Sequence, residues 1–137
     1  GLFGTCSGGR HAFLIGCSSD KFDAIVECWG GNVIMDKENI TDKQPISPVT
    51  LSKNLSSPIL GIFGNDDVSP PPDQVNEHEN LLKKHNKDYQ FHRYDGAGHG
   101  FMYYDRPIYR QEQSVDAWGK IISFLNYLGI IYKLVMS

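Results

Sequence analysis

The chain has 137 residues, of which 40% are hydrophobic and 21% charged, and its formal net charge is −3. This length suits one small domain, and the charge balance excludes the basic footprint of a protein that binds nucleic acid or an anionic membrane. The chain has three cysteines, Cys6, Cys17 and Cys28. An odd number cannot form a full disulfide framework, which favours a reducing, cytoplasmic compartment. The cysteines also lack zinc-site spacing, so we predict no metal, and we expect no other cofactor.

The first ten residues contain Gly4-x-Cys6-x-Gly8, the pattern of a nucleophile elbow with cysteine in place of the commoner serine. An elbow joins a strand to a helix in one sharp turn, with the nucleophile in a strained backbone conformation. Gly4 and Gly8 are expected where the chain passes too close for a Cβ. We predict a thiol nucleophile at Cys6 and an oxyanion held by the Ser7 backbone N–H. On the motif alone, a buried cysteine in a glycine-rich turn is an equally good interpretation.

The elements after the elbow alternate between helix and strand. Strands are predicted at residues 1–3, 22–28, 58–64 and 89–94. Helices are predicted at residues 7–17, 74–85 (after an Asp73 cap) and 110–128, with Gly129 as the last stop. Residues 32–57 form a polar excursion with a helical turn near 49–54. This order predicts a mostly parallel α/β sheet with helices on both faces, in one domain spanning 1–137.

Two features concern the ends of this domain. Only residues 1–3 remain of the strand that an elbow needs, so we expect the chain to be the C-terminal part of a longer protein whose first strands are missing. Residues 130–137 form an apolar tail in which Lys133 interrupts any membrane span.

The two later helices have predicted inner and outer faces. The inner face of the last helix is predicted to comprise Val115, Trp118, Ile121, Ile122, Leu125 and Leu128. On the helix at 74–85, Val75, Leu81 and Leu82 are predicted to face inward, whereas His78 and His85 are expected in solvent.

Three chemically reactive residues, Cys6, Asp67 and His99, each follow a predicted strand. The carboxyl ends of parallel strands meet at one edge of the sheet, so we expect these side chains to lie together. A histidine can take the proton of a thiol, and a carboxylate orients the imidazole. The order nucleophile, acid, histidine is that of the α/β-hydrolase fold. Cys6 would attack the carbonyl of a small ester, thioester or lactone, and His99 would later activate water.

Each assignment has a competitor in the chain. His11 lies just past the elbow, but its helical spacing turns it away from the apex, so we favour His99. Asp66 competes with Asp67 for the acid, and we favour Asp67. Arg10 and Arg106 are candidates for binding a substrate carboxylate, although surface ion pairs are the commoner use of arginine.

The motifs together resemble the dienelactone hydrolase family, the carboxymethylenebutenolidases of the α/β-hydrolase superfamily. They are Gly4-x-Cys6-x-Gly8-Gly9-Arg10, then Pro58-x-Leu60-x-x-x-Gly64-x-x-Asp67, then Gly96-Ala97-Gly98-His99-Gly100-Phe101. The resemblance covers residues 1–129 and implies a triad of Cys6, His99 and Asp67 that hydrolyses a lactone or related ester. Founding members bind the substrate carboxylate with an arginine four residues after the histidine. Here that position is Tyr103, which with Tyr104 and Arg106 implies a differently shaped acyl pocket.

Two other classes of function fit the same residues. An acyltransferase would form the same acyl-cysteine but pass the acyl group to an alcohol or amine, so its products would change with an added acceptor. A non-catalytic binding module would keep its biological activity when Cys6 is replaced by alanine. The complete triad argues against the binding module.

Overall fold

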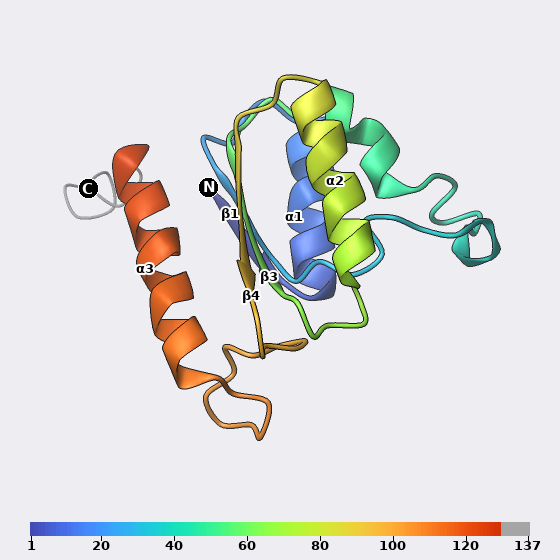
Figure 1. Cartoon of the computed structure of the whole chain (residues 1–137). Helices are drawn as coiled ribbons and strands as arrows, with labels where there is room; N and C mark the ends of the chain where they lie inside the picture. The colour runs from blue at the N-terminus through green and yellow to red at the C-terminus, as the bar shows by residue number, and fades with distance from the viewer. Residues whose placement is uncertain (130–137) are drawn as a thin grey trace.

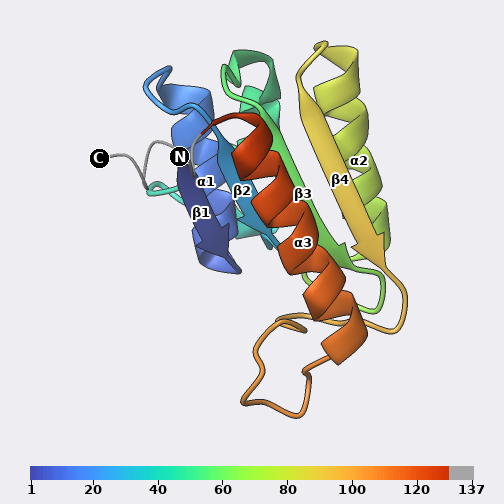
Figure 2. The ribbon, with the colours of Figure 1, turned by 90° about the vertical axis from the view of Figure 1, so that its left-hand side faces the viewer.

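A four-stranded parallel sheet forms the centre of the protein. The computed structural model describes residues 1–129, and the apolar tail predicted at 130–137 lies outside them. The strands β1 (Leu2–Thr5), β2 (Ile25–Cys28), β3 (Ile59–Gly64) and β4 (Tyr89–Tyr94) lie side by side in chain order (Figure 2). The helices α1 (Ser7–Ser18) and α2 (Pro72–Lys84) cover one face, and α3 (Gln111–Tyr127) covers the other (Figure 1). The predicted α/β class is confirmed.

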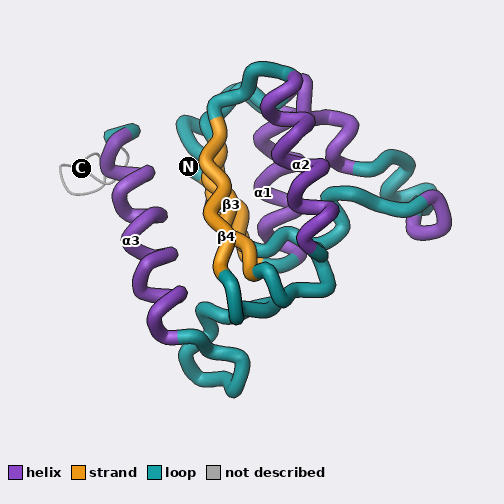
Figure 3. Tube along the Cα trace, viewed as in Figure 1, coloured by secondary structure: helices purple, strands orange, loops and turns teal. Residues whose placement is uncertain are grey.

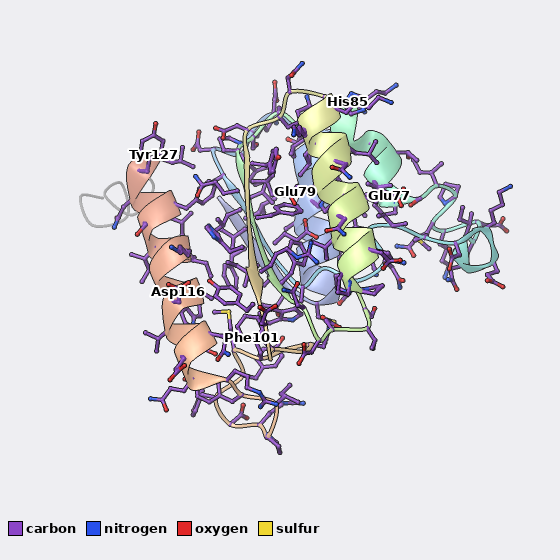
Figure 4. The ribbon with its side chains drawn as sticks, in the orientation of Figure 1. Glu77, Glu79, His85, Phe101, Asp116 and Tyr127 are labelled. Atoms are coloured by element: carbon purple, nitrogen blue, oxygen red, sulfur yellow. The ribbon has the colours of Figure 1, made fainter. Side chains whose placement is uncertain are left out.

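Each face of the sheet has its own hydrophobic core. Side chains alternate along a strand, so Ile25 and Ile59 point to the core under α1 and α2, whereas Val26 and Leu60 point to the core under α3. Because both faces are covered, β2 and β3 are buried along their whole length. Phe101, which follows β4, lies between the sheet and α3 (Figure 4).

Two of the connections between the strands and helices are long. After β2 the chain makes two short 3-10 helices, η1 (Lys37–Asn39) and η2 (Pro48–Asn54), before it returns to β3. The predicted helical turn near 49–54 is therefore confirmed, and it packs beside α1 and α2. A second long loop joins β4 to α3 and lies at the carboxyl end of the sheet (Figure 3). None of the helices described within 1–129 is long and apolar enough to cross a membrane.

The start of α2 differs from the prediction. The helix begins at Pro72, with Pro71 as its N-cap, whereas the sequence pattern placed the cap at Asp73. Proline is tolerated in the first turn because its missing N–H has no partner there and its φ already suits a helix. Asp73 instead lies in the first turn, where its Oδ1 accepts a hydrogen bond from the Gln74 N–H at 2.9 Å.

The buried stripe of α3 is also rotated from the predicted one. Ser114, Ala117, Ile121 and Phe124 are buried, at the i, i+3, i+7 and i+10 spacing of one helical face. Trp118 is 46% exposed and stacks on Phe3 of β1, with ring centroids 5.8 Å apart. Ile121 is buried as predicted, whereas Val115 and Ile122 are exposed, and Leu125 and Leu128 are only partly buried beside the core. The prediction was therefore wrong about the width of the buried face, because a narrow stripe of small and apolar residues is enough to meet the sheet.

Candidate active site

The turn between β1 and α1 has the geometry of an elbow. Cys6 occupies it with φ 56° and ψ −125°, a conformation that side chains rarely adopt and that costs about 1–3 kcal/mol. A Cβ on Gly4 would lie 2.0 Å from the Gly8 carbonyl oxygen, so Gly4 meets the steric expectation. A Cβ on Gly8 would have no heavy atom within 4 Å, so that expectation was wrong. Gly9 has the second close approach, because a Cβ there would lie 2.9 Å from the Cys28 carbonyl oxygen of β2.

The structure places His99 within hydrogen-bonding distance of both Cys6 and Asp67. His99 Nε2 lies 3.1 Å from Cys6 Sγ, and His99 Nδ1 lies 2.9 Å from Asp67 Oδ2. Asp67 is 4% exposed, and its other oxygen, Oδ1, accepts a hydrogen bond from the Ser69 N–H at 2.8 Å. Both carboxylate oxygens are therefore engaged, which fixes the ring of His99 and directs Nε2 at the thiol.

The competing residues lie elsewhere. Asp66 is exposed and meets the loop of His99 through its backbone, whose N–H donates to the Ala97 carbonyl at 3.0 Å. His11 is exposed on α1. His85 lies at the carboxyl end of α2, remote from the elbow (Figure 4). Among these candidates, His99 is therefore the histidine that contacts the Cys6 thiol, and Asp67 is the aspartate that contacts His99.

The N-terminus of α1 supplies hydrogen-bond donors beside the thiol. Ser7 is the first residue of this helix, and the first N–H groups of a helix have no partner within it. The Cys6 carbonyl accepts the later N–H groups of Gly9 and Arg10. When a carbonyl carbon bonds to Sγ, its oxygen becomes negatively charged. The Ser7 N–H, at the positive end of the helix, can donate a hydrogen bond to that oxygen.

An open cleft of about 320 Å³ lies over the thiol. Its lining residues are Cys6, Ser7, Arg10, Gly31, Asn32, Asp67, Val68, Ser69 and His99. Among the three residues predicted to bind substrate, Arg10 is on the wall of this cleft.

Tyr103 and Arg106 are not among the residues that line the cleft. The Tyr103 hydroxyl lies 2.9 Å from Thr5 Oγ1, and the Tyr103 ring packs edge-on against Trp29. Arg106 is exposed, with its guanidinium 5.8 Å from the centre of the Tyr103 ring. The structure therefore places Tyr103 as a link between the His99 loop and β1, directly before the nucleophile.

A second histidine–carboxylate pair lies in the core between β2 and α2 and was missed in the sequence. His78 of α2 is 2% exposed, and its Nε2 lies 3.1 Å from Oε2 of Glu27, which is fully buried in β2. The expectation that His78 is solvated was wrong, because a buried carboxylate requires a partner. The signal was Glu27 itself, a charged residue in the middle of an apolar strand.

The other two thiols are buried, whereas Cys6 is partly exposed. Burial, followed by the negative charge of Glu27, raises the pKa of the Cys17 thiol from 9.0 to about 12. The same two causes raise the pKa of the Cys28 thiol, which is fully buried under α3. Within residues 1–129, no three His, Cys, Asp or Glu side chains gather in a way that could hold a metal ion.

Comparison with known proteins gives relatives over almost the whole chain. The model of the dienelactone hydrolase family matches residues 1–128. A protein of Escherichia coli K12 named "Putative carboxymethylenebutenolidase" is 31% identical over 128 residues, which are 93% of this chain and 46% of the relative. A Bradyrhizobium protein named "Probable 2-oxo-3-(5-oxofuran-2-ylidene)propanoate lactonase" is 28% identical over 93% of this chain and 50% of its own length. The chain thus spans about half the length of these curated relatives.

Solved structures contain the same arrangement of strands and helices. The crystal structure named "Putative Dienelactone Hydrolase" from Klebsiella pneumoniae superposes with a TM-score of 0.81 at 28% identity, over 93% of this chain and 50% of that one. An acylaminoacyl peptidase of Pyrococcus horikoshii has a TM-score of 0.74 at 20% identity, which shows the shared fold alone. From the family model over residues 1–128 and the superposition on the Klebsiella structure, we conclude that this chain belongs to the dienelactone hydrolase family.

Proposed function

We propose that the protein hydrolyses a small carboxylic ester or lactone through an acyl-cysteine intermediate. The observation that carries this proposal is the continuous contact from Asp67 Oδ2 through His99 to Cys6 Sγ, at 2.9 and 3.1 Å. Family membership supports the reaction class, and one relative is named a lactonase. A nucleophilic thiol beside two further free cysteines suits a reducing, cytoplasmic compartment.

The first half of the reaction forms the acyl-cysteine. His99 Nε2 takes the proton of the Cys6 thiol as Sγ attacks the carbonyl carbon, while Asp67 stabilises the imidazolium. The carbonyl oxygen gains a negative charge, and the Ser7 N–H at the start of α1 donates to it. When the tetrahedral intermediate collapses, the carbon–oxygen bond of the ester breaks and the leaving alkoxide takes the proton from His99.

The second half releases the acid and restores the thiol. His99 Nε2 takes a proton from a water molecule that enters the cleft, and the resulting hydroxide attacks the acyl carbon. Collapse of the second intermediate breaks the carbon–sulfur bond, and the Cys6 thiolate takes back the proton. The open side of the cleft admits this water, since the His99 side chain is 37% exposed.

Acyl trapping tests the proposal. The protein is mixed with 4-nitrophenyl acetate, quenched in acid and digested, and the acetyl group is located by peptide mass spectrometry. We expect acetyl on Cys6 and on neither Cys17 nor Cys28, and we expect the label to be lost in His99→Gln. No label on Cys6, or equal label on the three cysteines, would overturn the proposal. An added alcohol that diverted most of the acyl group from water would indicate an acyltransferase.

A further inference from the structure

The segments that follow β3 and β4 carry two members of the triad, and both leave the sheet at its carboxyl end (Figure 3). The last paired residues of these strands are Gly64 and Tyr94. A Cβ on Gly64 would lie 2.1 Å from the Ala97 carbonyl oxygen, so the two segments are in close contact. Past this pair the strands no longer hold the segments together. The contacts between the segments themselves therefore determine how Asp67 meets His99.

Three successive residues of the turn after β3 each contact the loop after β4. The Asn65 N–H donates to the carbonyl of the last residue of β4 at 2.8 Å, and the Asp66 N–H donates to the Ala97 carbonyl at 3.0 Å. The Asp67 carboxylate then meets His99 Nδ1 at 2.9 Å. The contact between the two catalytic groups is thus the third in a series that begins at Asn65.

The side chain of Asn65 adds a second pair of hydrogen bonds to the first of these contacts. Its Nδ2 donates to Asp95 Oδ1 at 2.6 Å, and its Oδ1 accepts from Arg93 Nε at 3.0 Å. Arginine only donates and a carboxylate only accepts, so these partners fix the orientation of the amide. Both bonds are charge-assisted, which makes them stronger than bonds between neutral groups. We call Arg93, Asn65 and Asp95 the strap.

Both ends of the strap are held by helices. Arg93 also donates to the Pro72 carbonyl at 3.2 Å and to Asn76 Oδ1, both in the first turns of α2. At the other end, Gln113 of α3 donates to the Asp95 carbonyl at 3.2 Å. Because α2 and α3 cover opposite faces of the sheet, the strap ties the two segments to supports on both sides.

We propose that Asn65 is a positioning residue, and that the strap holds Asp67 at the distance from His99 at which its carboxylate orients the ring. None of the three strap residues lines the cleft, so they act through Asp67 and not on the substrate. This proposal rests on the proposed function for the role of the triad. Its first test measures the reactivity of the Cys6 thiol and needs no turnover of an ester.

The first experiment measures the rate constant for alkylation of Cys6 by iodoacetamide in the intact protein, at one pH, by peptide mass spectrometry. In this reaction Sγ forms a bond to carbon, iodide leaves and His99 takes the thiol proton. Asn65→Asp removes the donor to Asp95 and places two carboxylates against each other. We expect this variant to alkylate Cys6 about tenfold more slowly than wild type, because a misplaced catalytic group slows the reaction.

Asp95→Asn provides a matched rescue. The variant Asn65→Asp/Asp95→Asn exchanges the amide and the carboxylate, so the carboxylate can accept from both Arg93 and the amide. Its formal net charge stays at −3. We expect this double variant to alkylate Cys6 within about threefold of the wild-type rate. Asp95→Asn alone keeps an acceptor for Asn65 and should also stay within about threefold, and Asp105→Asn, which removes an exposed charge from the same loop, within about twofold.

The two buried thiols show whether a variant has only loosened the fold. Cys17 and Cys28 are buried, so alkylation at either one reports opening of the core. A positioning role predicts slower alkylation at Cys6 and unchanged rates at the buried thiols. Faster alkylation of Cys17 or Cys28 in Asn65→Asp, with the rate at Cys6 unchanged, would make the strap a purely structural link and overturn the proposal.

A double-mutant cycle tests whether the strap acts through Asp67. Asp67→Asn already breaks the contact between the carboxylate and the imidazole. Adding Asn65→Asp to that variant should therefore lower the rate at Cys6 by less than about twofold. A further tenfold fall in the Asp67→Asn background would show that the strap acts by another route, and the proposal would be wrong.

Ester hydrolysis separates this proposal from the proposed function. With 4-nitrophenyl acetate, Asn65→Asp should lower kcat about tenfold and leave KM within about threefold, because the strap does not touch the substrate. If no protein turns over the ester but the rates at Cys6 follow the order above, the proposed function fails and the strap stands. If the ester is turned over and Asn65→Asp changes neither kcat nor the rate at Cys6, the strap fails and the proposed function stands.

Discussion

Residues 1–129 contain two histidine–carboxylate pairs of similar geometry in opposite surroundings. His99 and Asp67 are 2.9 Å apart at the mouth of the cleft, and the His99 side chain is 37% exposed. His78 and Glu27 are 3.1 Å apart in the core, and their side chains are 3% and 0% exposed. The second pair lies on the α1 and α2 side of the sheet, below the edge that carries the first.

The difference between the pairs lies at the other ring nitrogen. His99 presents Nε2 to the Cys6 thiol, whereas Nδ1 of His78 is buried without a partner and the ring packs against Phe13 and Phe91. A histidine held by a carboxylate becomes a base only where its second nitrogen meets a reacting group. We infer that the pair at the cleft serves chemistry and that the pair in the core serves stability.

The largest effect is expected for His99→Gln. The amide cannot take the thiol proton, so kcat/KM for an activated ester should fall by about 10³–10⁴-fold. The thermal midpoint should move by only a few degrees, because His99 is partly exposed and fills no core position. Steady-state kinetics and thermal melts measure both quantities. Turnover within tenfold of wild type would contradict the assignment of the base.

A second prediction separates the two adjacent aspartates. Asp67→Asn should lower kcat/KM by about 10²-fold or more, because the amide holds the wrong tautomer of His99. Asp66→Asn is the matched control and should stay within about twofold, since Asp66 is exposed and meets the site through its backbone. The reverse ranking of the two variants would exchange their roles.

The third prediction concerns the buried pair. His78→Leu leaves Glu27 buried without its partner and should cost about 3–5 kcal/mol in the free energy of unfolding. Replacing both residues with leucine should cost less than His78→Leu alone, because no buried charge remains. Urea denaturation gives these values, and kcat/KM per folded molecule should stay within about threefold. A tenfold loss of activity in a folded double variant would give the buried pair a role in catalysis.

The smallest effect involves Cys17, whose thiol is buried and also lies near the negative charge of Glu27. Its pKa is raised to about 12 in the folded chain, against 9.0 for a free thiol. The unfolded chain therefore binds fewer protons than the folded chain between these values, and stability should be fully present below pH 9 and decline as the pH rises toward 12. Urea denaturation at pH 8 and pH 10.5 measures the decline. It should be shallower in Cys17→Ala; an equal decline in both proteins would contradict the prediction.

The position of the reactive edge could be predicted from the sequence because it depends on local patterns. Cys6, Asp67 and His99 each follow the carboxyl end of a strand, and parallel strands bring such ends together whatever the remaining detail. The choice between Asp66 and Asp67 depends on how the turn after β3 is rotated, which the sequence does not show. In the structure Asp67 faces inward, and its Oδ1 accepts a hydrogen bond from the Ser69 N–H.

Other features depended on partners that are distant in the sequence. His78 and Glu27 are 51 positions apart, so nothing near His78 revealed that its ring is buried. The orientation of α3 depended on Phe3, which stacks on Trp118 from the opposite end of the chain. Arg10 and Arg106 were equal candidates in the sequence, and only the shape of the cleft separated them.

The order of the strands has a consequence for how the protein folds. Because β1, β2, β3 and β4 are neighbours in chain order, each strand can dock on one that is already in place. Parallel pairing still requires each crossover segment to close before its contacts form, which makes such sheets slow to assemble. Cys6 and His99 are separated by 93 positions and meet only after β4 has docked. During refolding, thiol reactivity controlled by His99 should therefore arise with the last step, after most helical structure has formed.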